Sequence, residues 1–169
     1  MKKTFSASKG LFVFIALSVA LAAGWVYYNP WAVAGGIHEN CQVQQVILQP
    51  PPGTDKSAVT VAAELALTDK KRQQGLMYRR SMAPDAGMLF FWEAPQQIVM
   101  WMKNTYIPLD MIYINGQEVV GIIEAANTRD TTPLTIPAPA DKVLEVNLGF
   151  SEARGIEKGW QVRMGPCLD

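Results

Sequence analysis

Short apolar runs separated by turn residues are the feature that most restricts how this chain can fold. From Val43 onward, such runs alternate with proline, glycine and asparagine about every ten residues. This spacing is typical of β-sandwiches and β-barrels. Strands do not alternate with long helical patterns, which disfavours a parallel sheet. We therefore expect a mainly β fold, with a single compact antiparallel domain of the sandwich or barrel type.

The individual runs predict about eight short strands and one or two short helices. Asn115-Gly116 is the strongest hairpin signal, because both residue types tolerate a positive φ. Thr68 is expected to cap a helix that ends at Gly75 in a left-handed conformation. The expected strands are 43–48, 59–66, 88–92, 98–102, 111–114, 119–123, 143–147 and 160–164, the expected helices are 68–74 and 151–154, and 131–140 is expected to be irregular.

The N-terminal segment has the pattern of an export signal or a membrane anchor. Three lysines among the first nine residues precede an aliphatic stretch, and no further charge follows until Glu39. A basic region before an apolar stretch directs a chain to the export machinery. Residues 10–28 are long enough to span a bilayer, with aromatic residues at the outer interface. The alternative is cleavage of a signal peptide near Ala34.

These observations predict three parts of the chain and a location. Residues 1–36 are expected to be the signal peptide or signal anchor, residues 37–57 a juncture with the first strand, and residues 58–166 the main domain. In either case the domain is periplasmic or extracytoplasmic. If the segment is not cleaved, the cytoplasmic membrane is its partner.

Two cysteines, Cys41 and Cys167, stand at the two ends of the expected domain. An even number of cysteines in an exported chain predicts a disulfide, since the compartment is oxidising. On the chain-entropy account, closing a loop of about 125 residues stabilises the fold by ~4–5 kcal/mol. The alternative is two free thiols at frayed ends.

Several classes of function are disfavoured by what the chain lacks. From Cys41 onward, 12 lysines and arginines stand against 14 acidic residues without basic clustering, so the charge pattern of nucleic-acid binding is absent. The single histidine, His38, lies outside the expected domain, which disfavours histidine-based catalysis and histidine-ligated zinc. No glycine-rich phosphate loop follows a strand. We expect no cofactor.

A set of ordered motifs resembles those of a known family. They are Glu64-Leu65-Ala66, Arg72 with Gly75-Leu76-Met77, Gly87-Met88-Leu89-Phe90, Trp101-Met102-Lys103-Asn104-Thr105, Pro108-Leu109-Asp110 and Leu144-Glu145-Val146-Asn147, followed by Gly149, Arg154-Gly155-Ile156 and Gly159. In this order they resemble domain-of-unknown-function family 192 over about residues 58–164. The resemblance implies a mainly β domain, often behind a signal peptide or anchor, and no established activity. At Gly159-Trp160 the family usually has Gly-Asp, so we expect Trp160 to pack on the sheet.

Two carboxylates are the candidates for chemistry. Asp110 begins an apolar strand, and Glu145 lies on the strand face opposite Leu144, on the same side as Asn147. Two carboxyl groups in one cleft are the minimum for general acid–base hydrolysis of a glycan. The alternative, which we favour, is a structural role in ion pairs or in capping backbone amides. The candidate ion pairs are Asp110–Lys103, Glu145–Arg72 and Glu145–Arg79.

A second candidate site combines Trp101, Lys103 and Asn104. An aromatic ring beside an ammonium and an amide suits sugar stacking or recognition of an anionic group. The alternative is a core tryptophan, a solvated lysine and an asparagine in a turn. The candidate ligand-binding residues are therefore Trp101, Lys103, Asn104, Asp110, Glu145 and Asn147.

Six of the eight methionines fall between residues 77 and 111, and Met100 and Met102 flank Trp101. Thioether groups in an exported protein can hold Cu(I). We favour the alternative, in which both side chains fill gaps on one face of a sheet.

The leading hypothesis is an exported or membrane-anchored envelope protein that acts as a non-enzymatic binding module for an envelope glycan, peptide or protein. A first alternative is a hydrolase that uses Asp110 and Glu145 on a cell-wall or polysaccharide substrate. A second alternative is a structural or assembly module.

Overall fold

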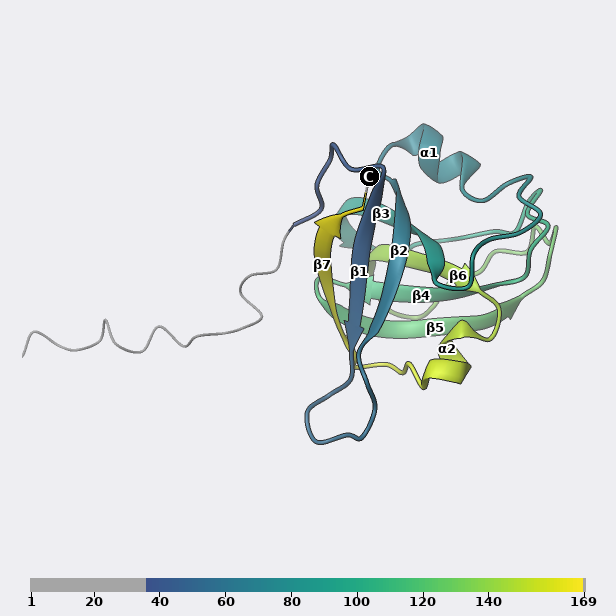
Figure 1. The fold of residues 1–169 in the computed structure, drawn as a ribbon. Coiled ribbons are helices and arrows are strands. Elements are labelled where there is room, and N and C mark those ends of the chain that lie inside the picture. Colours follow the sequence, from purple (N-terminus) through teal and green to yellow (C-terminus); the bar gives the residue numbers. More distant parts are fainter. Residues whose placement is uncertain (1–35, 169) are drawn as a thin grey trace, which may run out of the picture. The chain divides into compact units, whose positions relative to one another are not determined.

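The computed structural model describes residues 36–168, and these form a closed β-barrel with two short helices (Figure 1). The mainly β class predicted from the sequence is confirmed, with seven strands in the described residues instead of about eight. The elements are β1 (Val43–Gln49), β2 (Val59–Ala66), α1 (Asp69–Gln74), β3 (Ala86–Gln96), β4 (Leu109–Asn115), β5 (Glu118–Ala126), β6 (Ala140–Asn147), α2 (Phe150–Arg154) and β7 (Gln161–Cys167).

The strands follow the order β1-β2-β3-β6-β4-β5-β7 around the barrel, and β7 pairs with β1 to close it. Neighbouring strands are antiparallel except β2 and β3, which are parallel. The wholly antiparallel arrangement predicted from the sequence is therefore wrong at this pair. The crossover between the two strands runs from Ala66 to Ala86 and contains α1, and a connection of this length can join parallel strands.

The strand predicted at 98–102 is also absent. Met100 forms only an isolated bridge with Leu134, through two backbone hydrogen bonds of 2.8 and 2.9 Å. The Met102 N–H donates to the carbonyl oxygen of Asp130 at 2.9 Å. This apolar segment thus pairs with another loop instead of joining the barrel, which its apolar sequence alone does not reveal.

The hairpin and the first helix form where the sequence predicts them. The two turn residues of the hairpin are Gly116 and Gln117 instead of Asn115 and Gly116, because Asn115 pairs with Glu118, and Gly116 adopts a φ of 58°. The Thr68 side chain accepts a hydrogen bond from the Lys71 N–H at the start of α1. Gly75 ends the helix with a positive φ of 47°, as expected, but its ψ of −136° lies outside the left-handed helical region.

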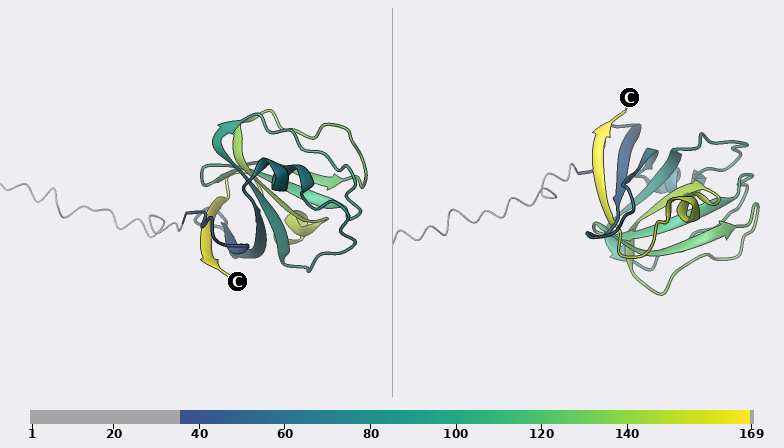
Figure 2. Two further views of the ribbon diagram at one scale, coloured as in Figure 1. Left: turned by 90° about the horizontal axis from the view of Figure 1, so that it is seen from above. Right: turned by 60° about the horizontal axis from the view of Figure 1, so that its bottom comes forward.

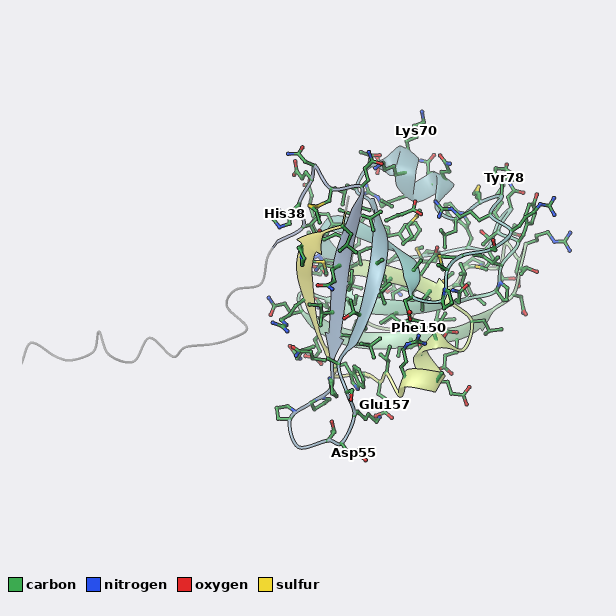
Figure 3. The ribbon with its side chains drawn as sticks, in the orientation of Figure 1. His38, Asp55, Lys70, Tyr78, Phe150 and Glu157 are labelled. Atoms are coloured by element: carbon green, nitrogen blue, oxygen red, sulfur yellow. A yellow bond between two sulfur atoms is a disulfide. The ribbon has the colours of Figure 1, made fainter. Side chains whose placement is uncertain are left out.

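The barrel wall separates two hydrophobic cores. The inner core fills the barrel, where Ile112, Leu144 and Val146 pack together, and Phe150 and Trp160 belong to it as well. Trp160 is 1% exposed, as expected from its departure from the family pattern. Phe150, labelled in Figure 3, is the first residue of α2, and its buried side chain joins this helix to the inner core.

The outer core lies on the opposite face of the same strands. Met111 and Tyr113 of β4 and Val143 of β6 are buried there with side chains from the connections β3–β4 and β5–β6. These two long connections gather on one side of the barrel (Figure 2). Strands β4 and β6 are consequently buried on both faces, which is unusual for antiparallel strands.

The predicted disulfide between Cys41 and Cys167 is confirmed, with a Cα–Cα distance of 5.6 Å. It joins the segment before β1 to the end of β7. Because β1 pairs with both β2 and β7, this strand is an integral part of the barrel wall.

The predicted N-terminal signal or anchor, including residues 10–28 and the cleavage site near Ala34, lies outside the described residues. Within residues 36–168, no helix is both long enough and apolar enough to cross a membrane.

Candidate functional site

Glu145 is a buried acid on the outer face of the barrel wall. Its register partners are Met88 on β3 and Met111 on β4, so its side chain lies among apolar neighbours. It is 4% exposed, and no described residue forms a hydrogen bond or ion pair with its carboxyl group. A buried polar group without a partner is rare in folded proteins and calls for an explanation.

Burial raises the pKa of Glu145 to about 8, because the charged carboxylate is poorly solvated there. The carboxyl group is therefore largely protonated at neutral pH. Tyr113 lies nearby on β4, and its pKa is also raised, first by burial and then by the charge of Glu145. The Tyr113 hydroxyl donates a hydrogen bond of 2.9 Å to the carbonyl oxygen of Leu134.

A cavity of about 230 Å³ opens beside Glu145, and we call it the Glu145 cavity. Glu145, Leu76 and Phe90 are almost fully buried and form its inner end, whereas Trp101 is 44% exposed and marks its mouth. The lining residues come from α1 and the turn after it, from β3, from the loop 99–105 and from β6. They are Asp69, Arg72, Gln73, Gln74, Gly75, Leu76, Met77, Phe90, Trp92, Val99, Met100, Trp101, Lys103, Thr105 and Glu145.

Arg72 holds the α1 side of the cavity in place. Its guanidinium group donates hydrogen bonds to the carbonyl oxygens of Leu67 at 2.8 Å and Phe91 at 2.6 Å. It also pairs with Asp69 and stacks over the Trp92 ring at 5.3 Å. Arg72 thereby links α1 to the residue that follows β2 and to the middle of β3.

The ion pairs predicted for Glu145 are wrong. Arg72 pairs with Asp69, and Arg79 pairs with Glu64 through two hydrogen bonds. The hydrogen bond from Arg79 is the main reason that the pKa of Glu64 is lowered. Glu145 thus lacks the compensating charge that Glu64 has.

Asp110 has a different environment from Glu145. It is fully buried on the inner face, and its Oδ2 accepts a hydrogen bond of 3.0 Å from the Ser151 N–H in α2. The predicted alternative in which Asp110 caps backbone amides describes this contact. The predicted pair with Lys103 is wrong, since Lys103 forms no ion pair within residues 36–168.

The structure brings three of the six candidate ligand-binding residues together, namely Trp101, Lys103 and Glu145. The other three lie elsewhere. Asn104 adopts a φ of 55°. Its side-chain amide donates a hydrogen bond of 3.0 Å to the Tyr78 hydroxyl and so links two loops. Asn147 donates to the carbonyl oxygen of Ala83 at 2.9 Å.

Met100 and Met102 are both buried in the outer core, where thioethers fill the space between the loops and the barrel wall. Met100 also lines the Glu145 cavity. Within the described part of the chain, histidine, cysteine and acidic side chains form no cluster suited to a metal ion.

Comparison with known proteins identifies the family of this chain. The model of the family DUF192, described as "Uncharacterized ACR", matches residues 52–164. This chain belongs to the DUF192 family. The match confirms the resemblance read from the motifs and includes every residue that lines the Glu145 cavity.

Two solved structures are similar to this DUF192 chain. One is a candidate transcription regulator from Sinorhizobium meliloti, with 35% identity and a TM-score of 0.69, covering 77% of this chain and 98% of that chain. The other is a protein of unknown function from Novosphingobium aromaticivorans, with 32% identity and a TM-score of 0.68, covering 79% of this chain and 94% of that chain. No curated protein matches.

Several of the motifs that carried the DUF192 resemblance meet at the Glu145 cavity. Arg72 and Gly75-Leu76-Met77, Phe90, the segment Trp101–Thr105 and Glu145 each contribute to its lining. The sequence interpretation did not assign Leu76, Phe90 or Thr105 to a site. All three belong to the ordered motifs of the family resemblance, and this was the signal that could have placed them at a common site.

Proposed function

We propose that this DUF192 protein is a non-enzymatic binding module of the cell envelope, exported or anchored by its N-terminal segment. Its ligand would be an envelope glycan, peptide or protein segment that enters the Glu145 cavity. The observation that carries the proposal is the buried Glu145 carboxyl group, which borders a cavity and has no partner among the described residues. A bound ligand would supply the hydrogen bonds that the protein does not.

The mouth of the cavity supports a role in binding. Trp101 is 44% exposed and lines the cavity together with Lys103, so the lining offers a stacking surface and a charge. A volume of about 230 Å³ is small for a ligand pocket. It suits a small molecule or the terminal group of a longer one.

The alternative hydrolase finds less support in the arrangement of the acids. Two-carboxylate hydrolysis needs both groups at one cleft, but Asp110 faces the inner core whereas Glu145 faces the cavity. The other acid in the cavity lining, Asp69, is exposed and paired with Arg72. Neither acid stands opposite Glu145 as a free catalytic partner.

A protein partner is the second candidate, because aromatic side chains extend the apolar surface beyond the cavity. Tyr78 packs edge-on against Tyr106 at 6.2 Å, and both are exposed. Figure 3 shows Tyr78 among the loops on this side of the barrel. Exposed aromatic side chains are typical of protein interfaces. This observation favours an assembly role at the same face.

The description of the Sinorhizobium meliloti protein as a candidate regulator gives no reason to propose nucleic-acid binding for this chain. From Cys41 onward, acidic residues outnumber lysines and arginines by 14 to 12, and the basic residues do not cluster. A basic patch or stripe is the usual mark of nucleic-acid binding.

The test is a thermal-shift screen of the full-length protein against muropeptides, oligosaccharides, short peptides and metal ions including Cu(I). A ligand present at 100 times its dissociation constant stabilises the folded state by about 2.7 kcal/mol. We expect a stabilising ligand whose effect is lost in Trp101→Ala and Glu145→Gln and kept in Glu152→Gln, a variant of an exposed acid on α2. A screen with no stabilising ligand, or a ligand insensitive to both cavity variants, would refute the proposal.

A further inference from the structure

We infer that the Glu145 cavity recognises a ligand that carries both a protonated amine and a carboxylate, the chemistry of an amino acid or a short peptide. Glu145 would receive the amine, and Lys103 would receive the carboxylate. This inference rests on the proposed function, because it names the ligand class for the same cavity.

The first step is the contrast between Glu145 and the other partly or fully buried acids. Asp110 accepts a hydrogen bond from the Ser151 N–H, and Glu64 accepts two from Arg79. Glu145 receives none from the described residues. Its hydrogen-bonding capacity is directed to the cavity, where an ammonium group would supply up to three N–H donors and a positive charge.

The walls near Glu145 suit the carbon skeleton of such a ligand. Leu76, Phe90 and Met100 are buried and apolar, and Trp101 adds an aromatic face at the mouth. Aromatic faces attract cations, most strongly where water is excluded. The Trp92 ring already faces Arg72 and stacks with Phe90, which leaves Trp101 as the exposed ring in the lining.

Lys103 is the cation available to a ligand carboxylate. Its exposed side chain lines the cavity and forms no ion pair or hydrogen bond within residues 36–168. The guanidinium group of Arg72, the other cation in the lining, is already engaged with two carbonyl oxygens and Asp69. A carboxylate at the mouth would therefore be met by Lys103.

Proton linkage distinguishes an amine from a neutral ligand. The charged or titratable groups around Glu145 are Tyr113 from β4, Lys103 from the loop, and Asp69 and Arg72 from α1, while β3 presents the apolar Met88 and Phe90. Since the pKa of Glu145 is about 8, an amine must displace its proton at neutral pH. The association constant should therefore rise about tenfold per pH unit between roughly pH 6 and 8. A neutral glycan that accepts a hydrogen bond from the protonated acid would instead bind more weakly above pH 8.

The experiment is isothermal titration calorimetry of the full-length protein with pools of free amino acids and short peptides. Each pool is used in three forms: unmodified, N-acetylated and C-terminally amidated. We expect the unmodified form to bind, acetylation to weaken binding at least tenfold, and amidation to weaken it severalfold. Titrations at pH 6, 7 and 8 should show tighter binding as the pH rises, with about one proton released per ligand at pH 6 and less at pH 8, where Glu145 is already partly ionised.

Two pairs of variants assign these effects to residues. Glu145→Gln should abolish the preference for a free amine and the pH dependence, whereas Glu152→Gln should keep both. Lys103→Gln should bind unmodified and amidated forms equally, whereas Lys158→Gln, a change of another exposed lysine, should still discriminate between them.

The outcomes separate this inference from the proposed function. Equal binding of N-acetylated and unmodified pools, or affinity that falls as the pH rises, would overturn the amine assignment. A glycan that binds in a Glu145-dependent manner while no pool binds would refute the inference and leave the proposed function standing. The absence of any cavity-dependent ligand would refute both.

Discussion

Asp110 and Glu145 lie on neighbouring strands but point to opposite faces of the barrel wall. Asp110 pairs with Val146, the residue after Glu145, so the pleat turns the two side chains apart. Asp110 faces the inner core and contacts α2, whereas Glu145 faces the outer core and the cavity. Two acids that are close along the sheet therefore have separate roles.

The stability of the wild type should fall relative to Glu145→Gln as the pH rises from about 5 to 8. The folded-state pKa of Glu145 is about 8 and its ordinary value is 4.5, so the folded state holds a proton that the unfolded state has lost. The proton held by Glu145 stabilises the folded state fully below pH 4.5. The free energy of unfolding then falls by ~1.4 kcal/mol per pH unit as the pH rises toward 8, where this contribution is lost. Urea unfolding at several pH values measures the difference, and parallel curves for the two proteins would contradict this prediction.

Replacement of Asp110 by alanine should destabilise the fold without a direct effect on the cavity. The change leaves the Ser151 N–H without its buried acceptor, which costs about 1–3 kcal/mol. Asp110→Asn retains an oxygen acceptor and should cost less. Chemical denaturation gives the stability difference, and a ligand of the Glu145 cavity should bind the folded variant with unchanged affinity. A tenfold weaker affinity would show that Asp110 does influence the cavity.

Reduction of the Cys41–Cys167 disulfide should lower the free energy of unfolding by ~5 kcal/mol on the chain-entropy account. The bond closes a loop with a sequence separation of 126, and its loss releases that constraint from the unfolded chain. Urea titrations with and without reductant measure the change. The double variant Cys41→Ser/Cys167→Ser should match the reduced wild type and be insensitive to reductant. Equal stability before and after reduction would argue against the constraint.

Gly87→Ala should destabilise the barrel at the β3–β6 pair. A Cβ atom at Gly87 would lie 2.6 Å from the Glu145 carbonyl oxygen and 3.0 Å from a Val61 methyl group. Such overpacking typically costs 1–3 kcal/mol, because the backbone must shift. Gly36→Ala is the matched control, since a Cβ there meets nothing within 4 Å. Thermal denaturation that shows equal midpoints for the two variants would contradict the close approach.

The sequence was most informative where a local signal decides the structure. Thr68 and Gly75 defined the ends of α1, the turn after Asn115 formed the hairpin, and Trp160 packs in the inner core as expected. The two-residue period also placed Glu145 on the face opposite Leu144. These features depend only on near neighbours in the chain.

The errors arose where pairing between distant segments decides the structure. Ile98–Met102 has the composition of a strand, but its hydrogen bonds go to the loop near Leu134. The parallel pairing of β2 with β3 and the register of Asp110 beside Val146 depend on how the barrel closes. The alternation of apolar and polar residues within one strand does not show which residues of the partner strand lie opposite.

The two cores described above separate the interior of the barrel from the Glu145 cavity. The inner core holds the barrel together without contribution from Leu76, Phe90 or Met100, which belong to the outer core. Substitutions among these cavity residues therefore leave the interior packing of the barrel in place. The side chains that line the Glu145 cavity can therefore be varied independently of those that fill the barrel.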